Sequence, residues 1–327
     1  MYEGTNNILG GFGMKILGLS CGTRNGNNDT MCRVALEAAQ EMGAEIEFIH
    51  VFDWDIKYCS GCVACSRGLV MGKGMICTQK DDYAALFDKM AEADGVLVVD
   101  PIYEKGGSGL FHVLADRMGP GHDIGMMYML DGKLKEQGKE GLNPMYLKKK
   151  AISFVGIGGS DWACRVETDH AMLALSPAWK VINNEYFSWS KDVIMQDDKV
   201  ERMKEIGRNL VEAAKDVENA KWMGKEGACP HCNGNNFYIY PGTTECECEL
   251  CGLHGTLEVI DGAFKFKFDP ADEHKAHDTI SGKKLHGDDI FQNEGRLMNL
   301  FKDPEFKARK EHYTNVCAPT PSPSKAV

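Results

Sequence analysis

The sequence predicts an α/β protein in which a doubly wound parallel sheet of roughly five strands precedes a smaller, cysteine-rich unit. Short apolar runs alternate with segments of helical composition up to Trp222, as in a sheet built from β-α-β units. After Trp222 the composition changes to Gly, Asn and Cys with short strand-like pieces. A chain of 327 residues is also long enough for one substantial domain and a second, smaller one.

The first half of the sheet is expected to contain three strands. A strand over Lys15 to Cys21 leads through a turn-rich loop into a helix over Thr30 to Met42. A second strand is expected at 45–51, a helix at 81–93, and a third strand at 95–100. The third strand, GVLVVD, is almost wholly apolar, which predicts the centre of the sheet, because strands covered on both faces form unbroken apolar runs.

The second half continues the alternation. After a helical stretch that follows Gly109 come a strand from Ala151, a helix at 166–176 and a strand at 180–186. The domain is expected to end with a helix over 197–222. One face of this helix carries apolar residues three or four positions apart, namely Val200, Met203, Ile206, Leu210, Ala214 and Val217. Lys148, Lys149 and Lys150 precede a strand and are expected to form a solvated edge.

Changes in composition divide the chain into four segments. They are a flexible leader over 1–13, the main domain over 14–222, a metal ribbon over 225–269 and a polar C-terminal extension over 270–327. The extension is expected to be helical over 288–301. It ends in the low-complexity sequence APTPSPSKAV, which is typical of a disordered tail.

Charge and cysteine content restrict the class of function. A formal charge of −11 disfavours nucleic acid or an anionic membrane as the main partner and favours a small molecule, an electron carrier or a protein. No apolar run approaches the length of a membrane span, and the N-terminal residues lack a secretory signal, so we expect a cytoplasmic protein. In that compartment, thirteen cysteines indicate metal ligation or redox chemistry more than disulfides.

The first strand-to-helix loop, SCGTRNGNNDT, has the composition of a monophosphate site. Backbone N–H groups and the positive end of the helix dipole would face the anion, with hydrogen bonds from side chains of the loop and charge from Arg24. The candidate donors are Ser20, Thr23, Asn28 and Thr30. By composition alone, a plain polar turn is an equally good interpretation. The loops DPIYEKGGSG and GIGGSD follow two further strands, so all three lie at the strand ends where doubly wound folds bind ligands.

Over Met14 to Trp222 the chain resembles the flavodoxin-like NADPH-dependent FMN reductases and, among them, the iron-sulfur flavoproteins. The first loop is similar to the family segment GSPRxxxNT, with Gly22 where the family has serine, which leaves Ser20 or Thr23 to supply the hydroxyl. Pro101-Ile102-Tyr103 resembles the stretch that lies against the isoalloxazine ring, and Gly158-Gly159 resembles the third loop.

The resemblance implies bound FMN, NAD(P)H as co-substrate, and a homodimer or homotetramer. The residues implied in cofactor binding are Ser20, Gly22, Thr23, Arg24, Asn28, Thr30, Pro101, Ile102, Tyr103, Ser108, Gly158 and Gly159. Tyr103 and Trp162 are candidates for the surroundings of the ring, although either could instead pack within its loop or the core.

The first cysteine set consists of Cys59, Cys62 and Cys65 at C-x2-C-x2-C spacing and Cys77 after eleven more residues. Three such thiols with a remote fourth can hold a 4Fe-4S cluster. The set resembles the compact motif of the iron-sulfur flavoproteins, with a longer final gap whose glycine-rich sequence could loop out. The alternative is that these cysteines are small packing residues, as in clusterless FMN reductases.

The second cysteine set consists of Cys229, Cys232, Cys248 and Cys251, with fifteen residues between the two pairs. Two C-x2-C pairs with a glycine after the last cysteine are typical of a tetrahedral zinc site, although rubredoxin-type iron takes the same four thiolates. Cys246 could substitute as a ligand but lacks the two-residue spacing. No Lys or Arg occurs from Gly227 to Gly262, so we do not expect this ribbon to bind nucleic acid.

These features lead to a hypothesis of an FMN-dependent oxidoreductase. It would pass electrons from NAD(P)H or a small carrier to a quinone, another flavin or an unsaturated organic compound. One alternative is an electron-transfer relay that has no substrate of its own. A third possibility is a clusterless reductase whose ribbon recruits a protein partner.

Overall fold

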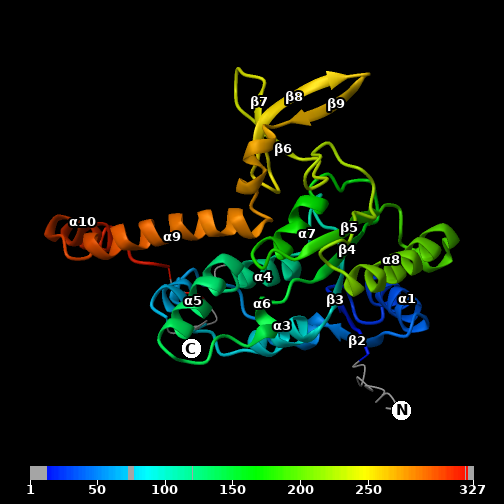
Figure 1. Cartoon of the computed structure of the whole chain (residues 1–327), viewed down its shortest axis with the longest axis horizontal. Helices are drawn as coiled ribbons and strands as arrows, with labels where there is room; N and C mark the ends of the chain where they lie inside the picture. The colour runs from blue at the N-terminus through cyan, green and yellow to red at the C-terminus, as the bar shows by residue number, and fades with distance from the viewer. Residues whose placement is uncertain (1–12, 73–76, 120, 321, 323–327) are drawn as a thin grey trace, which may run out of the picture. The chain divides into compact units, whose positions relative to one another are not determined.

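The computed structural model describes residues 13–72, 77–119, 121–320 and 322. Its centre is a parallel sheet in the order β2-β1-β3-β4-β5 (Figure 1). The strands are β1 (Lys15–Ser20), β2 (Glu45–His50), β3 (Gly95–Pro101), β4 (Ala151–Ile157) and β5 (Lys180–Phe187). The predicted fold class is confirmed, and β3 is the central strand, as its apolar sequence predicts.

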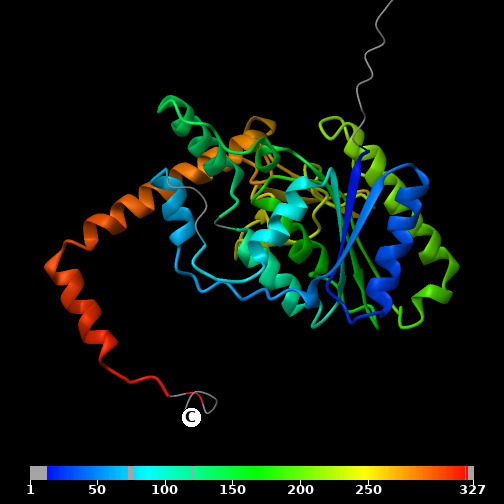
Figure 2. The same ribbon diagram turned by 90° about the horizontal axis from the view of Figure 1, so that it is seen from below.

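Helices cover both faces of this sheet (Figure 2). On one face, α1 (Asn27–Glu41) and α8 (Asp197–Lys215) pack in one apolar cluster. On the other, α3 (Tyr83–Glu92), α4 (Gly109–Met118) and α7 (Val166–Leu175) form a second cluster. The sequence-based prediction of α8 was too long, because the Asp216 carboxylate accepts hydrogen bonds from Asn219 and forms a turn in place of further helix.

Further helices lie in segments for which the sequence analysis expects none. They are α2 (Ala64–Val70), α5 (Ile124–Glu136) and α6 (Pro144–Leu147). Short 3-10 turns, η1 (Val51–Asp53), η2 (Val193–Met195) and η3 (Pro270–Lys275), complete the loops. Leu69 of α2 packs against Met126 and Leu130 of α5 in a small core of their own. The segment expected to loop out before Cys77 therefore begins as helix, and its residues 73–76 lie outside the described chain.

Lys150 corrects the expectation of a solvated lysine edge. Its side chain is buried, and its ammonium group donates to the carbonyl oxygens of Ala91 and Ala93 at the C-terminal end of α3. Those carbonyls have no partner within a helix, so a lysine that satisfies them caps α3. Lys148 and Lys149 remain on the surface and pair with Asp94 and Glu218.

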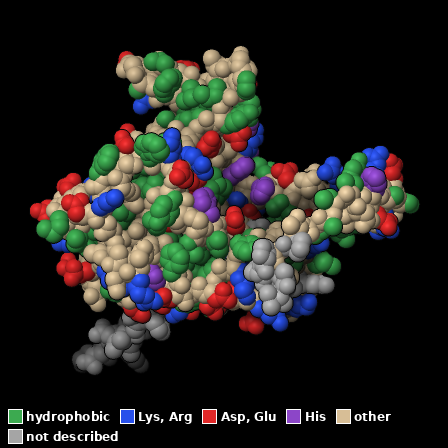
Figure 3. Space-filling model, turned by 180° about the vertical axis from the view of Figure 1, so that it is seen from behind, with side chains coloured by type: hydrophobic (Ala, Val, Ile, Leu, Met, Phe, Trp, Pro, Cys, Tyr) green, Lys and Arg blue, Asp and Glu red, His purple; other side chains and the backbone are tan. Residues whose placement is uncertain are grey.

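The cysteine-rich unit folds around a small antiparallel sheet. Its strands are β6 (Phe237–Ile239), β7 (Glu245–Cys248), β8 (His254–Ile260) and β9 (Ala263–Lys267), in that order. The predicted strand-like pieces are β6 and β9. The turn between β8 and β9 has positive φ at Asp261 and Gly262, as a two-residue hairpin requires. Apolar side chains of this sheet, including Val259 and Phe264, are exposed and gather over it in Figure 3.

Contacts divide the chain into a compact unit that ends at Lys284 and another that begins at Leu285. Helix α9 (Ile280–Leu300) continues across this boundary, and α10 (Pro304–Thr314) follows. The predicted leader falls almost wholly on residues 1–12, and most of the last residues of the predicted tail are likewise outside the described chain. None of the described helices is both long enough and apolar enough to cross a bilayer.

Candidate functional site

The first loop leaves an uncapped helix end beside a buried amide. Helix α1 begins after Gly26, and in the described chain no side chain caps its first turn. The Asn28 amide nitrogen is buried and has no hydrogen-bond partner among the described residues. A Cβ atom at Gly22 would lie 2.5 Å from Asn28 Oδ1, so only glycine fits beside this amide. An uncapped helix N-terminus and an unpaired buried donor together suit an anion.

Other predicted residues of this loop lie in different surroundings. Ser20 is buried at the end of β1, whereas Thr23 and Arg24 are exposed. Arg24 pairs with Asp53. The Thr30 hydroxyl donates to the Gly26 carbonyl oxygen at 3.0 Å, within the helix backbone. Of the six predicted residues of this loop, Gly22 and Asn28 therefore have the most distinctive geometry.

Asp29 holds the loop in shape and was not in the predicted site. Its carboxylate accepts the Asn25 backbone N–H at 2.7 Å and lies 2.9 Å from His50 Nδ1. Both side chains are buried. An acid in the first turn of a helix is the available signal in the sequence, but the pairing with His50 depends on β2 and is not visible there.

The second loop follows β3 and turns tightly before α4. Tyr103 and Gly106 exchange backbone hydrogen bonds around Glu104 and Lys105, both with positive φ. Pro101 ends β3, and the Ile102 N–H donates to the Ile157 carbonyl oxygen, which ties this loop to the end of β4. Tyr103 is 64% exposed, so its ring is free to contact a ligand.

Ser108 closes the second loop from inside. Its hydroxyl donates to Asp100 at 2.6 Å and accepts the Phe111 N–H, which caps α4. Asp100 also accepts the Ser108 N–H and lies 3.3 Å from His170 Nε2 in the core. No pattern in the sequence relates Asp100 to His170, because the two residues are 70 positions apart. Ser108 therefore positions the loop, and its place in the cofactor set stays a prediction.

The third loop packs directly on the second. A Cβ atom at Gly158 would approach the Ile102 side chain to 3.1 Å, and Gly158 exchanges backbone hydrogen bonds with Phe187 and Ser190. Gly159 has more room. Farther along this loop, Trp162 is 64% exposed, and Lys105 Nζ lies 5.5 Å from its ring centroid. Exposed aromatic rings therefore follow β3 and β4 at the carboxyl edge of the sheet. The first loop, whose donors suit an anion, follows the neighbouring strand β1.

All four cysteines of the first set line one cavity of about 440 Å³. Among the described residues, their sulfur atoms do not meet the 4.8 Å grouping that the second set forms. A hydrogen bond from Thr78 lowers the pKa of Cys62 to about 7, whereas burial raises that of Cys65. Four thiols that face a shared space without closing on one point suit a group larger than a single ion.

Polar and aromatic side chains from α3, α4 and the loop residues next to them complete this cavity. Arg117 pairs with Asp81 and lies over the ring of Tyr83. The His122 ring packs against Phe87 at an interplanar angle of 47°, and burial lowers the pKa of His122 to about 4, so it is neutral at physiological pH. None of these residues is predicted from the sequence, because nothing in their spacing relates them to the cysteines.

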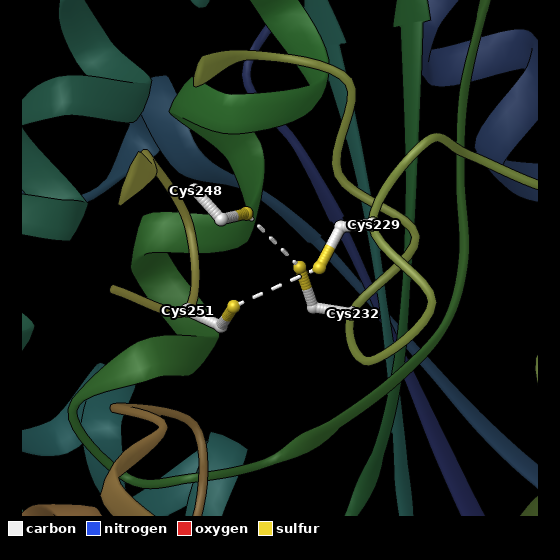
Figure 4. A group of neighbouring side chains, drawn as sticks. All are labelled: Cys229, Cys232, Cys248 and Cys251. Carbon is white, nitrogen blue, oxygen red and sulfur yellow. Dashed lines mark hydrogen bonds between the residues drawn. The ribbon is translucent and has the colours of Figure 1, made fainter. Parts of the chain in front are cut away.

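The second set does close on one point (Figure 4). Its four sulfur atoms lie within 4.8 Å of one another, with 3.8 Å between Cys229 and Cys251 and 3.5 Å between Cys232 and Cys248. Thiolates bound tetrahedrally at ~2.3 Å from one ion stand roughly 3.8 Å apart. The geometry fits one tetrahedral metal ion. Cys246 is buried near this site but is not a member of the group.

Comparison with known proteins gives the family. The model of the NADPH-dependent FMN reductase family matches residues 14–193, more than half of the chain. This chain belongs to that family. A solved flavone reductase has 42% sequence identity and a TM-score of 0.84, and the similarity covers 94% of this chain and all of that one.

Curated relatives of this FMN reductase family member fall into two groups. It is 35% identical to an iron-sulfur flavoprotein of Archaeoglobus fulgidus over 104 residues and 38% identical to one of Methanocaldococcus jannaschii over 108. These matches cover 32% and 33% of this chain, and it spans about half the length of each relative, 48% and 53%. The match to a flavone synthase of Aspergillus candidus, at 27% identity, covers 85% of this chain and 89% of the relative.

The first loop fits the phosphate of the family's cofactor. The unpaired Asn28 amide, the uncapped start of α1 and the space kept open by Gly22 provide donors and room for a dianion. The exposed rings of Tyr103 and Trp162 follow neighbouring strands at the same edge, so a flat ring system attached to that phosphate would have aromatic surfaces near it.

Proposed function

We propose that this protein is an FMN-dependent oxidoreductase that reduces an unsaturated aromatic ketone with electrons from NAD(P)H. The observation that carries the proposal is the full-length similarity to a flavone reductase at 42% identity. The similarity to a flavone synthase, over 85% of this chain, supports the same two compounds, a flavone and its reduced form, with the reaction running in the opposite direction. Which direction prevails would then depend on the electron partner.

The residues of the three loops would divide the work of binding. Asn28 and the start of α1 would hold the FMN phosphate, and Asp29 keeps the loop in the conformation that presents them. Bound FMN supplies hydride transfer. The Asp100–Ser108 pair and the Ile102 N–H would fix the second loop, so the ring edge would face a defined surface.

The exposed rings suit a flat acceptor. Tyr103 and Trp162 can stack against an aromatic ketone, and the Lys105 ammonium lies beside the Trp162 ring. When a carbon–carbon double bond conjugated to a carbonyl is reduced, negative charge develops on the carbonyl oxygen. A nearby cation stabilises that charge. We therefore favour an α,β-unsaturated aromatic ketone of the flavone type over a quinone or a second flavin.

The two cysteine sets would have separate tasks. The first would hold a 4Fe-4S cluster, because each thiolate then binds a different iron and the four sulfurs stand farther apart than around one ion. A cluster beside a flavin allows two-electron equivalents to be split into single electrons. The second would hold structural zinc, with rubredoxin-type iron as the alternative, and would keep β6–β9 folded.

The direct test uses full-length protein purified and assayed without oxygen. NADH or NADPH consumption is followed with a flavone, and the product is analysed by mass spectrometry for the addition of two hydrogen atoms. We expect turnover that depends on bound FMN, with the reverse reaction detectable from the flavanone and an oxidised electron acceptor. Protein that binds no FMN after reconstitution, or that reduces quinones but no flavone, would contradict the proposal.

The similarity to the iron-sulfur flavoproteins supports a second candidate, an electron relay without a substrate of its own. Reduction only by a ferredoxin-like donor, with no turnover on NAD(P)H and a small acceptor, would favour it. We further propose that the protein is a homodimer or homotetramer and that it is located in the cytoplasm. Light scattering with the holoprotein would measure the oligomeric state.

A further inference from the structure

Arg117 is a buried cation in the wall of the cavity that the first cysteine set lines. It lies on α4, its side chain is 3% exposed, and burial of a charge at this depth is costly unless partners compensate it. The cavity also contains Tyr83, whose ring lies 4.4 Å from the guanidinium carbon. The guanidinium is therefore screened little on its buried side, whereas Cys77 in the same cavity is exposed to solvent.

Three hydrogen bonds to two partners, Asp81 and Lys57, fix the orientation of the guanidinium. The Asp81 carboxylate accepts from both terminal nitrogens, one of them Nη2 at 3.1 Å, and Nη1 also donates to the Lys57 carbonyl oxygen at 2.7 Å. Asp81 is itself held by the backbone N–H groups of Lys57 and Tyr83. Bidentate pairing of this kind leaves the planar group little freedom.

The orientation directs one remaining N–H at a cysteine. Arg117 Nη2 lies 3.4 Å from Cys77 Sγ, within hydrogen-bond range for sulfur. Cys77 is the remote member of the first set, with eleven residues between it and Cys65. The contact therefore joins α4 to the cysteine whose place in the set the sequence leaves least determined.

We propose that Arg117 sets the reduction potential of the iron-sulfur cluster at this cavity by donating an N–H···S hydrogen bond to Cys77. The inference rests on the proposed cluster at Cys59, Cys62, Cys65 and Cys77. Reduction adds one electron to the cluster and forms no bond, so the net negative charge there rises by one. A donor to a ligating sulfur and a buried positive charge both stabilise the more negative state, which raises the potential.

Asp81 and Arg117 should have opposite electrostatic effects on the reduction potential of the cluster. The Asp81 carboxylate neutralises part of the guanidinium charge while it holds the donor in place. Loss of the cation and loss of the anion should therefore move the potential in opposite directions. A purely structural role predicts no such opposition, because both changes would loosen the same loop.

The experiment is a potentiometric titration of anaerobically purified full-length holoprotein, followed by the EPR signal of the reduced cluster. In Arg117→Met, the equilibrium constant for one-electron reduction should fall at least tenfold, which is ~59 mV towards more negative potential. Asp81→Asn should raise the potential. The potential of Arg117→Lys should lie between those of wild type and Arg117→Met. One ammonium group keeps the positive charge but does not reach both Asp81 and Cys77, as the planar guanidinium does.

Arg202→Met is the matched control. Arg202 is also paired with carboxylates, those of Glu185 and Glu205, but it lies on α8 on the opposite face of the sheet. Its loss should leave the potential unchanged. Iron content and the melting temperature are measured for every variant, so that an altered potential is read only from protein that holds its cluster.

Different results separate the inference from the function on which it rests. Wild-type protein that binds no iron at the first cysteine set overturns the cluster and the role of Arg117 together. A cluster whose potential is equal in wild type and Arg117→Met overturns the role of Arg117 alone. If Arg117→Met fails to retain iron, the potentials of Arg117→Lys and Asp81→Asn test the role of Arg117 instead. That role is overturned if these two potentials do not shift in opposite directions from the wild-type value.

Discussion

Gly22 and Asn28 face each other across the first loop with no room for another atom between them. The closest approach of a Cβ atom at Gly22 would be 2.5 Å, to the Asn28 side chain, whose amide nitrogen is buried without a partner in the described chain. A donor kept in this state costs free energy unless a ligand pairs with it. Glycine at position 22 thus leaves the Asn28 side chain in this place.

Gly22→Ala should weaken FMN binding at least tenfold, because the added methyl group displaces the Asn28 amide from the place where it would meet the phosphate. FMN fluorescence quenching on titration into apoprotein measures the affinity. Gly13→Ala is the control, since a Cβ atom there meets nothing within 4 Å. Equal affinity in the two variants would show that Asn28 takes no part in the site.

Lys150 is the second residue whose role depends on its surroundings. Burial lowers its pKa to about 8 from the ordinary value of 10.5, and it caps α3 through the carbonyls of Ala91 and Ala93. Between these pH values the unfolded chain binds more protons than the folded chain. The contribution of Lys150 to stability is therefore lost as pH falls through 8 and is complete above 10.5.

Relative to Lys150→Met, the wild-type free energy of unfolding should rise by up to about 3 kcal/mol between pH 7.5 and 10.5, since each pKa unit corresponds to about 1.4 kcal/mol. Urea unfolding at several pH values measures the difference. Lys149→Met, a change on the surface, should show the pH dependence of the wild type. A parallel dependence in Lys150→Met would mean that the ammonium is not desolvated in the folded state.

At the scale of elements, the ribbon β6–β9 has a small core that is built around the four cysteines whose geometry fits one metal ion. Its buried cluster consists mainly of Cys229, Cys246, Cys248 and Cys251, with Leu253, Phe266 and Ala276. A core of this size would offset little of the conformational entropy of the strands, so the proposed metal ion would supply much of the folding free energy of the ribbon.

Cys248→Ser should lose one metal ion per chain and unfold the ribbon while the parallel sheet persists. Elemental analysis gives the metal content, and limited proteolysis locates cleavage within residues 225–269. Cys246→Ser changes a neighbouring buried thiol outside the ligand group and should retain the metal. Loss of the metal in both variants would indicate that Cys246 shares in ligation.

The whole molecule consists of two compact units, one up to Lys284 and one from Leu285. The predicted functional residues of the flavin site and both cysteine sets belong to the first unit. Several apolar side chains of the second are exposed on α9 and at its end, among them Leu285, Phe291, Met298 and Phe301. Exposed helices of this kind open locally at low cost.

In limited digestion of the holoprotein, trypsin should therefore cut first within residues 285–327. FMN and the metal should both stay bound to the remaining fragment. Mass spectrometry identifies the fragments, and gel filtration separates any released cofactor. Release of FMN in step with this cleavage would show instead that the second unit is needed for the flavin site. The undigested holoprotein, incubated in parallel, controls for spontaneous loss.

Local sequence patterns predict the order of the five parallel strands along the chain, the central place of GVLVVD and the four cysteines that lie within 4.8 Å of one another. These features are local: they depend on the periodicity of apolar residues over a few turns and on C-x2-C spacing. The same local reasoning misplaced Lys150, because a run of three lysines is normally solvated and burial depends on which helix ends beside the strand.

Packing of the strands and helices brings together residues that lie far apart in the sequence. The pairs Asp29 with His50, Asp100 with His170 and Arg117 with Cys77 are 21, 70 and 40 residues apart. No pattern in the sequence relates such residues, since their contacts arise when strands and helices pack. The chain thus fixes by spacing which groups can bind metal, and only packing brings the charge of Arg117 to the sulfur of Cys77.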